Sequence, residues 1–162
     1  MSSAGRDFDV VYRDNLRRLV AQAYLVTGDV EEARDCVQEA FARAWVRWDR
    51  LSVEVDDPVA WLSTVTYRIA ISGWRRRQAA KGALRRLGRP QPCPPPSVEA
   101  VLVATALARL PPGQRAVVVL HYYEGQRVED IARTLSLSVS AVKSRLLRAR
   151  TALGPLVDGK ES

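Results

Sequence analysis

Between residues 125 and 153, apolar residues recur at helical spacing in two short runs separated by a three-residue break. The first run is Val128, Ile131, Ala132 and Leu135, and the second is Val139, Val142, Leu146, Ala149 and Leu153. The break is Ser136-Leu137-Ser138, and the Ser138 hydroxyl can accept from the first N–H groups of the second helix. Two short helices with facing apolar stripes and a tight turn between them predict a helix-turn-helix.

The second of these helices turns a polar and basic face away from its apolar stripe. This face holds Ser140, Lys143, Ser144, Arg145, Leu147 and Arg148. In a helix-turn-helix the second helix enters the DNA major groove, so the pattern predicts DNA binding. The alternative is a core helix whose charges are simply solvated. The coincidence of cap, turn length and paired stripes favours the DNA-binding interpretation.

The bulk composition narrows the class of protein. The chain has 162 residues, a formal net charge of +7, one histidine and two cysteines. The positive charge favours a polyanionic partner. No apolar run is long enough to span a bilayer and no signal peptide opens the chain, so we expect a cytoplasmic protein without membrane insertion.

The same composition argues against an enzyme. The sequence contains no Gly-rich phosphate loop and no cluster of metal-ligand residues, so we expect no catalytic residue, no metal and no cofactor. Cys36 lies in a helical pattern and Cys93 in a proline-rich stretch. We expect both as reduced thiols, with Cys36 more readily a buried structural thiol than a redox switch.

Helical periods along the whole chain, without a strand pattern, predict an all-α fold of two small helical domains. We expect domains at residues 7–80 and 98–156, joined by a proline-rich linker at residues 81–97 that is too rich in glycine and proline to be helical.

Within the first domain, Asp29 should start a second helix with Glu32 as its capping-box partner. Residues 50–57 read as a loop, and Pro58 suits the first turn of a third helix that ends near Arg77.

Two helical faces in the first domain suggest binding surfaces. Asp35, Gln38 and Glu39 share a face of the second helix, which is either a solvated acidic surface or a docking site for a basic partner. The third helix carries a stripe of Tyr67, Ile71 and Trp74 beside Arg68, Arg75 and Arg76. Such a surface can stack unpaired bases and hold phosphates, whereas the alternative is a helix packed on two sides with its aromatic residues buried.

Three segments together resemble the extracytoplasmic-function (ECF) sigma factors, a class of RNA polymerase specificity subunits. In order, they are DVEEARDCVQEAFARAW, PVAWLSTVTYRIAISGWRRR and LPPGQRAVVVLHYYEGQRVEDIARTLSLSVSAVKSRLLRAR. The resemblance covers almost everything between residues 7 and 153. Each segment is moderately specific alone, and the ordered set with a proline-rich spacer is highly specific.

The resemblance implies roles for the surfaces noted above. Asp35, Gln38 and Glu39 would dock on the β′ coiled-coil of core RNA polymerase, with further contact to the β subunit. Residues 50–57 would capture a base flipped out of the −10 promoter element. The third helix would read −10 DNA through Trp61, Thr64, Arg68, Trp74, Arg75 and Arg76. The helix-turn-helix would read the −35 element through His121, Ser140, Lys143, Ser144, Arg145, Leu147 and Arg148. An anti-sigma factor is a further implied partner.

Some positions depart from the family pattern. Ser63 and Thr64 stand where the family commonly shows arginine, and Arg68 where it commonly shows asparagine. Ser72 and Trp74 replace an acid and a leucine, and Ala141 stands where threonine is usual. Most of these changes lie in the predicted −10 helix, so they bear on −10 recognition.

Two other functions compete with a sigma factor. A stand-alone helix-turn-helix regulator would bind duplex DNA tightly without polymerase. A recombinase or nuclease would need a carboxylate set that binds metal, but the dense acidic cluster has the spacing of a docking face on one helix.

Overall fold

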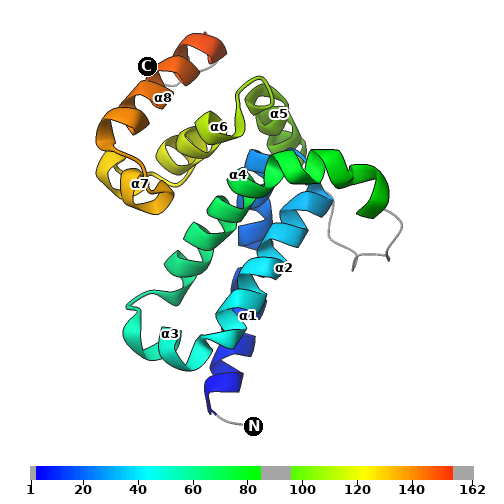
Figure 1. Cartoon of the computed structure of the whole chain (residues 1–162), viewed down its shortest axis with the longest axis vertical. Helices are drawn as coiled ribbons and strands as arrows, with labels where there is room; N and C mark the ends of the chain where they lie inside the picture. Colours follow the sequence, from blue (N-terminus) through cyan, green and yellow to red (C-terminus); the bar gives the residue numbers. More distant parts are fainter. Residues whose placement is uncertain (1–2, 85–95, 155–162) are drawn as a thin grey trace.

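The computed structural model describes residues 3–84 and 96–154, and all regular secondary structure within these ranges is helical. The N-terminal group comprises α1 (Ser3–Thr27), α2 (Val30–Val46), α3 (Trp48–Glu54) and α4 (Pro58–Leu84). The C-terminal group comprises α5 (Val98–Leu107), α6 (Pro112–Val118), the π-helical turn η1 (Val119–Tyr123), α7 (Val128–Leu135) and α8 (Val139–Leu153) (Figure 1). The prediction of an all-α fold is confirmed.

The N-terminal group is built on α1, α2 and α4, which pack against one another. Asp29 begins α2 as predicted, because its Oδ1 accepts from the N–H groups of Glu31 and Glu32 at 2.9 and 3.1 Å. The predicted capping box is only half formed. The N–H of Asp29 donates to Thr27 Oγ1 at 3.3 Å instead of to Glu32, whose side chain is buried.

The expected loop at residues 50–57 is largely wrong. Trp48 and Leu51 are buried and anchor the short helix α3, so only residues 55–57 are irregular. Asp57 then caps α4, since its Oδ1 accepts from Val59 and Ala60 N–H groups at 3.0 and 3.1 Å. Pro58 occupies the first turn as expected, because a proline there lacks only an N–H that would be unpaired anyway.

Helix α4 continues to Leu84, beyond its predicted end near Arg77, so the first residues of the predicted linker are helical. The remainder of the predicted linker up to residue 95, including Cys93, lies outside the described residues. Ser97 caps α5 as predicted, accepting from the Ala100 N–H at 3.1 Å. Cys36 is 0% exposed, in agreement with the expectation of a buried thiol.

The two helical groups lie against each other. Helices α6 and α7 contact α4, and α5 contacts α1 (Figure 1). The buried apolar residues of both groups form one continuous cluster that runs from Leu19 and Leu62 to Val117 and Leu146. No described helix is both long enough and apolar enough to cross a membrane.

Candidate nucleic-acid interface

Helices α7 and α8 form the predicted helix-turn-helix. Ile131 and Ala132 of α7 are buried, as are Val142 and Leu146 of α8, and the two helices are in contact. Ser138 caps α8 by accepting from the Ala141 N–H at 3.1 Å, as expected.

Val139 was predicted to belong to the apolar stripe of α8. It is 37% exposed instead. As the first residue of α8, it lies at the helix end beside the cap. The stripe therefore begins one turn later, at Val142, which is 0% exposed.

The turn between α7 and α8 is a Schellman motif with serine in place of the usual glycine. Ser136 adopts a left-handed conformation with φ 54°. The Leu137 N–H donates to the Ala132 carbonyl at 2.9 Å, and the Ser136 N–H to the Arg133 carbonyl at 3.4 Å. These bonds satisfy two of the carbonyls that a helix end leaves without intrahelical partners.

The outward face of α8 gathers most of the predicted −35 residues. Ser140, Lys143, Ser144, Leu147 and Arg148 are all exposed. Leu147 is 65% exposed among these polar groups, which suits contact with a thymine methyl in the major groove. The face thus combines hydrogen-bonding, cationic and apolar groups, the mixture that base edges and phosphates require.

Two other predicted −35 residues have partners inside the C-terminal group. Arg145 is half-buried, and its Nη1 would lie 2.7 Å from a Cβ at Gly113, so its guanidinium packs on the start of α6. His121 Nδ1 lies 3.0 Å from the Gln126 carbonyl oxygen. The ring must carry its proton on Nδ1 to donate there, which leaves Nε2 for another partner.

A contact that the sequence patterns did not reveal holds the C-terminal part of α8. Arg150 Nε donates to the Tyr122 hydroxyl at 2.5 Å, and the guanidinium carbon lies 5.7 Å from the centre of that ring. Tyr122 belongs to η1, so this cation–π contact fixes α8 against the turn that precedes the helix-turn-helix. The run of aromatic residues at 121–123 was its only sequence signal.

Of the predicted −10 residues on α4, Trp61 and Thr64 are less accessible than the face of α8, whereas Arg68 is exposed. Trp61 is half-buried and packs on the core, and Thr64 is also half-buried. Arg68 reaches across to α7, as described below. The side chains of Trp74, Arg75 and Arg76 lie outside the described residues.

Tyr67 follows the packed alternative for the aromatic stripe of α4. It is 1% exposed, and its hydroxyl donates to Glu124 Oε1 at 2.7 Å. Burial, followed by the charge of Glu124, raises the pKa of the Tyr67 hydroxyl far above its usual range. Tyr67 therefore cannot stack on a base in this arrangement.

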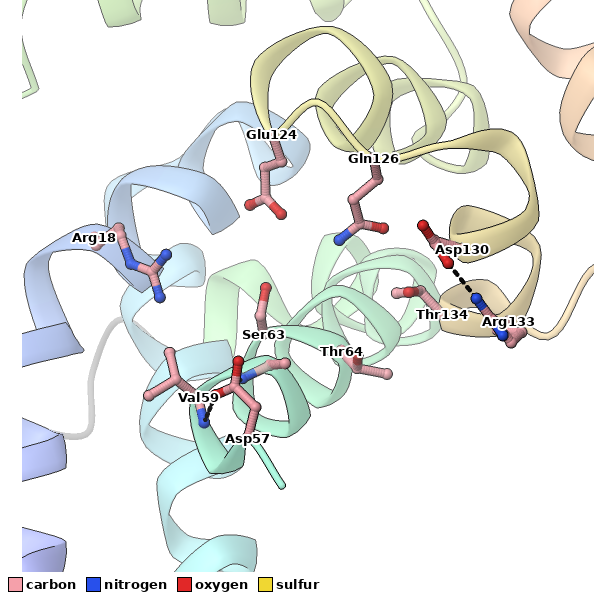
Figure 2. Close-up of a pocket in the computed structure, with 11 residues that line it drawn as sticks. Arg18, Asp57, Val59, Ser63, Thr64, Glu124, Gln126, Asp130, Arg133 and Thr134 are labelled. Carbon is pink, nitrogen blue, oxygen red and sulfur yellow. Dashed lines mark hydrogen bonds and ion pairs between the residues drawn. The ribbon is translucent and has the colours of Figure 1, made fainter. Parts of the chain in front are cut away.

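A cleft of about 400 Å³ separates the start of α4 from the C-terminal group (Figure 2). Its lining comprises Arg18, Asp57, Val59, Ala60, Ser63, Thr64, Glu124, Gln126, Asp130, Arg133 and Thr134. Burial raises the pKa of Glu124, while the Tyr67 hydrogen bond and the charge of Arg18 oppose that shift. The cleft thus brings the predicted −10 residue Thr64 beside α7, and α7 also contacts α8.

The predicted docking residues on α2 are exposed. Asp35, Gln38 and Glu39 all lie on the outside of the N-terminal group. Gln38 Nε2 donates to the Tyr12 hydroxyl at 2.9 Å, and Glu39 forms an ion pair with Arg43. Among the described residues, no group of histidine, cysteine and acidic side chains could hold a metal ion.

Comparisons with known proteins cover both helical groups. Residues 11–80 match the family model described as Sigma-70 region 2, and residues 100–153 match Sigma-70, region 4. The ECF RNA polymerase sigma factor SigL of Mycobacterium tuberculosis is 34% identical over 149 residues, covering 88% of this chain and 84% of that protein. EcfG of Rhodopseudomonas palustris is 33% identical over 149 residues, covering 88% of this chain and 82% of that protein.

Solved structures agree with the sequence matches. The sigma factor RpoE, crystallised with the anti-sigma factor NepR from Bartonella quintana, gives a TM-score of 0.69 at 26% identity, covering 96% of this chain and 99% of that chain. CnrH, in complex with the cytosolic domain of CnrY, gives 0.62 at 29% identity, covering 97% and 91%. The match to both sigma-70 regions supports a promoter-specific polymerase factor over a stand-alone regulator. The chain belongs to the ECF RNA polymerase sigma factors.

Proposed function

We propose that this sigma factor docks on core RNA polymerase through the acidic face of α2, and reads a promoter with two helices. Helix α4, in the domain at residues 7–80, reads the −10 element, and α8, in the domain at residues 98–156, reads the −35 element. The proposal rests chiefly on one observation. The exposed mixed face of α8 lies in the same chain as the exposed acidic face of α2, so one surface suits DNA and the other a basic protein.

Docking through α2 predicts that removal of acidic charge weakens assembly with core polymerase. We expect the double variant Asp35→Ala/Glu39→Ala to co-migrate poorly with core enzyme and to support little promoter-specific transcription. Asp14→Ala is the matched control, because Asp14 is an exposed acid of the same domain on a different helix. Core binding that is equal in the double variant and the control would contradict the proposed docking face.

An apolar face on α5 suggests a second contact with polymerase. Val98 is 73% exposed and Leu102 is 65% exposed, on a helix whose residues are almost all apolar. Helices of that composition are normally covered, and exposed apolar patches commonly mark protein interfaces. We assign this face to the β subunit. Leu102→Asp should weaken core binding, whereas Thr105→Asp, an exposed polar position on the same helix, should not.

An anti-sigma factor is a proposed regulator. The similar proteins RpoE and CnrH were each solved with another chain, NepR and the cytosolic domain of CnrY. By analogy, an inhibitor of this chain would cover surfaces that polymerase needs. We expect the factor to act in the cytoplasm, where core polymerase and chromosomal DNA meet, and to carry out no chemistry of its own.

A further inference from the structure

Two arginine side chains cross the boundary between the helical groups in opposite directions. Arg68 of α4 donates from Nε to the Thr134 carbonyl at 2.8 Å, and from Nη2 to the Arg133 carbonyl at 3.3 Å and to Ser136 Oγ at 3.0 Å. Arg115 of α6 donates from Nη1 to the Val26 carbonyl at 2.7 Å and from Nε to the Leu110 carbonyl at 2.7 Å. Each helical group thus supplies a cation to the other.

Both arginines meet the C-terminal end of a helix. The last carbonyls of a helix lack intrahelical partners and carry partial negative charge, so a cation there is favoured. Val26 lies in the last turn of α1, and Thr134 in the last turn of α7. The Schellman bonds use the carbonyls of Ala132 and Arg133, and Arg68 supplies a donor for Thr134. The pattern is reciprocal capping across the domain boundary.

A third polar contact crosses the same boundary between the helical groups. The Tyr67 hydroxyl donates to Glu124 of the loop after η1. Tyr67 and Arg68 are adjacent, so two successive residues of α4 hold the C-terminal group. Directional hydrogen bonds of this kind fix one relative placement, which an apolar contact alone would specify less sharply.

When the two helical groups are in contact, an arrangement called closed below, the proposed DNA-reading helices α4 and α8 differ in accessibility. Arg68 is bound to α7, and Ser63 and Thr64 line the cleft that α7 closes on one side (Figure 2). Lys143, Ser144 and Leu147 of α8 remain exposed. The departures from the family pattern at Ser63, Thr64 and Arg68 therefore fall where α4 meets the C-terminal group.

Size alone requires the closed form to open, if the proposed function holds. A compact chain of this length has a radius of gyration of about 15 Å, and is therefore roughly 40 Å across. Elements named −10 and −35 lie about 25 base pairs apart, or roughly 85 Å at 3.4 Å per base pair. One closed molecule cannot contact both elements at once, so promoter reading needs separation of the two groups.

We propose that the reciprocal capping by Arg68 and Arg115, with the Tyr67–Glu124 bond, is an autoinhibitory latch that holds the free factor closed with its −10 helix against α7. This inference rests on the proposed function. Core polymerase would open the latch because it would bind the open form more tightly than the closed form.

The test uses the full chain and a variant that removes both donors of α4, Tyr67→Phe/Arg68→Met. The phenylalanine keeps the buried ring, and the methionine keeps an unbranched side chain of similar length. Arg109→Met is the control, because Arg109 is an exposed arginine of the C-terminal group whose side chain makes none of the latch bonds described above. Ser136→Gly is a milder second variant that removes one acceptor, while glycine suits the left-handed φ of 54° at this position.

Small-angle X-ray scattering gives the first readout, and the association rate with core polymerase the second. We expect wild type and Arg109→Met to show a radius of gyration of about 15–18 Å. The double variant should expand by several ångströms and bind core about fivefold faster, because a larger fraction is already competent. Ser136→Gly should shift both quantities in the same direction by less. Circular dichroism checks that each variant remains helical.

Three results would overturn the latch. The first is a wild-type chain that is already extended. The second is a helical double variant or Ser136→Gly variant with unchanged size. The third is expansion without faster association. Failure of the proposed function looks different, because then neither wild type nor any variant binds core, whatever the scattering shows.

Discussion

Helices α4 and α8 are both proposed to read DNA, yet they differ in how accessible their side chains are in the same molecule. The outward face of α8 is exposed, with Leu147 at 65% exposure. On α4, Tyr67 is 1% exposed, Thr64 lines a cleft and Arg68 is bound to α7. The difference follows from packing. Helix α8 presents one face to the core, whereas α4 contacts α1, α2, α6 and α7.

This comparison shows that a side chain can have the right chemistry to bind DNA and still be engaged in contacts within the protein. Arginine, threonine and tyrosine on α4 have the groups that DNA recognition uses. In the closed chain, Tyr67 and Arg68 bond to the C-terminal group, and Thr64 lines the cleft between the two groups. Under the proposed account, α8 is available to −35 DNA before polymerase binds, and α4 becomes available to −10 DNA when the two groups separate.

Substitution of a buried residue beneath the outward face of α8 should have the largest effect of the changes considered. Leu146 is 5% exposed beneath the reading face, so Leu146→Ala should destabilise the fold by about 2–5 kcal/mol through loss of contacts and a cavity. The adjacent exposed Leu147 is the matched control, and Leu147→Ala should change stability by less than about 0.5 kcal/mol. Urea unfolding measures both. Equal losses at the two positions would contradict the assignment of Leu146 to the buried face and Leu147 to the exposed face of α8.

One charged residue on the outward face of α8 tests how this face contacts DNA. Lys143→Ala should weaken binding to a −35 duplex by about 1–3 kcal/mol if the side chain reads a base edge. If Lys143 contacts only phosphate, the loss should be uniform across sequences, and the salt slope should fall by about one. Fluorescence anisotropy at several salt concentrations distinguishes these cases. Arg109→Ala removes the same charge from the C-terminal group at a position away from α8 and should leave duplex binding nearly unchanged.

The N-caps of the two helices offer a smaller, paired test. Ser138→Ala removes the acceptor for Ala141 in α8, and Asp57→Ala removes the acceptor for Val59 and Ala60 in α4. Each should cost about 1 kcal/mol. Hydrogen exchange should show faster opening of the first turn of the altered helix alone. Loss of protection throughout the helix that was not altered would mean that α4 and α8 do not behave as separate elements.

The smallest expected effect is a pH dependence of the closed arrangement. Burial raises the pKa of Glu124, opposed by Tyr67 and Arg18, and Asp57 and Asp130 also line the cleft. A raised pKa means that the closed form binds the proton more tightly. Closure is therefore favoured at acidic pH, and this contribution is lost as pH rises through the raised pKa. Glu124→Gln is neutral and can still accept from Tyr67, so it should reduce the dependence of the radius of gyration on pH. A pH dependence as large as that of wild type would assign the effect to another group.

Local patterns were enough to predict much of the molecule. The stripes of α7 and α8, the Ser138 and Ser97 caps and the burial of Cys36 follow from helical spacing and capping chemistry. The structure confirms them, except that Val139 does not join the α8 stripe. The short helix α3 was missed because a run of seven residues carries little periodic signal, and burial of Trp48 and Leu51 stabilises it. The half-formed capping box at Asp29 was missed because Thr27 competes for the same N–H.

Contacts between the two groups could not be read from the sequence. Arg68 and Thr134 are separated by 66 positions, and Arg115 and Val26 by 89. No local spacing relates such pairs, so Arg68 was predicted only as a DNA contact. Arg115 did carry a signal. It is a charged residue directly before the apolar run Ala116 to Leu120, and a buried charge in such a run requires a partner.

Site-specific photocrosslinking tests the two-reader account most directly. A photoreactive amino acid would replace Leu147 on α8 or Thr64 on α4, with a promoter identified by mapping transcripts made when the factor is overproduced. We predict that position 147 crosslinks to −35 DNA both with and without core polymerase, and that position 64 crosslinks to −10 DNA only with core polymerase. Crosslinking of position 64 to −10 DNA by the free chain, or of position 147 outside the −35 element in the holoenzyme, would contradict the account.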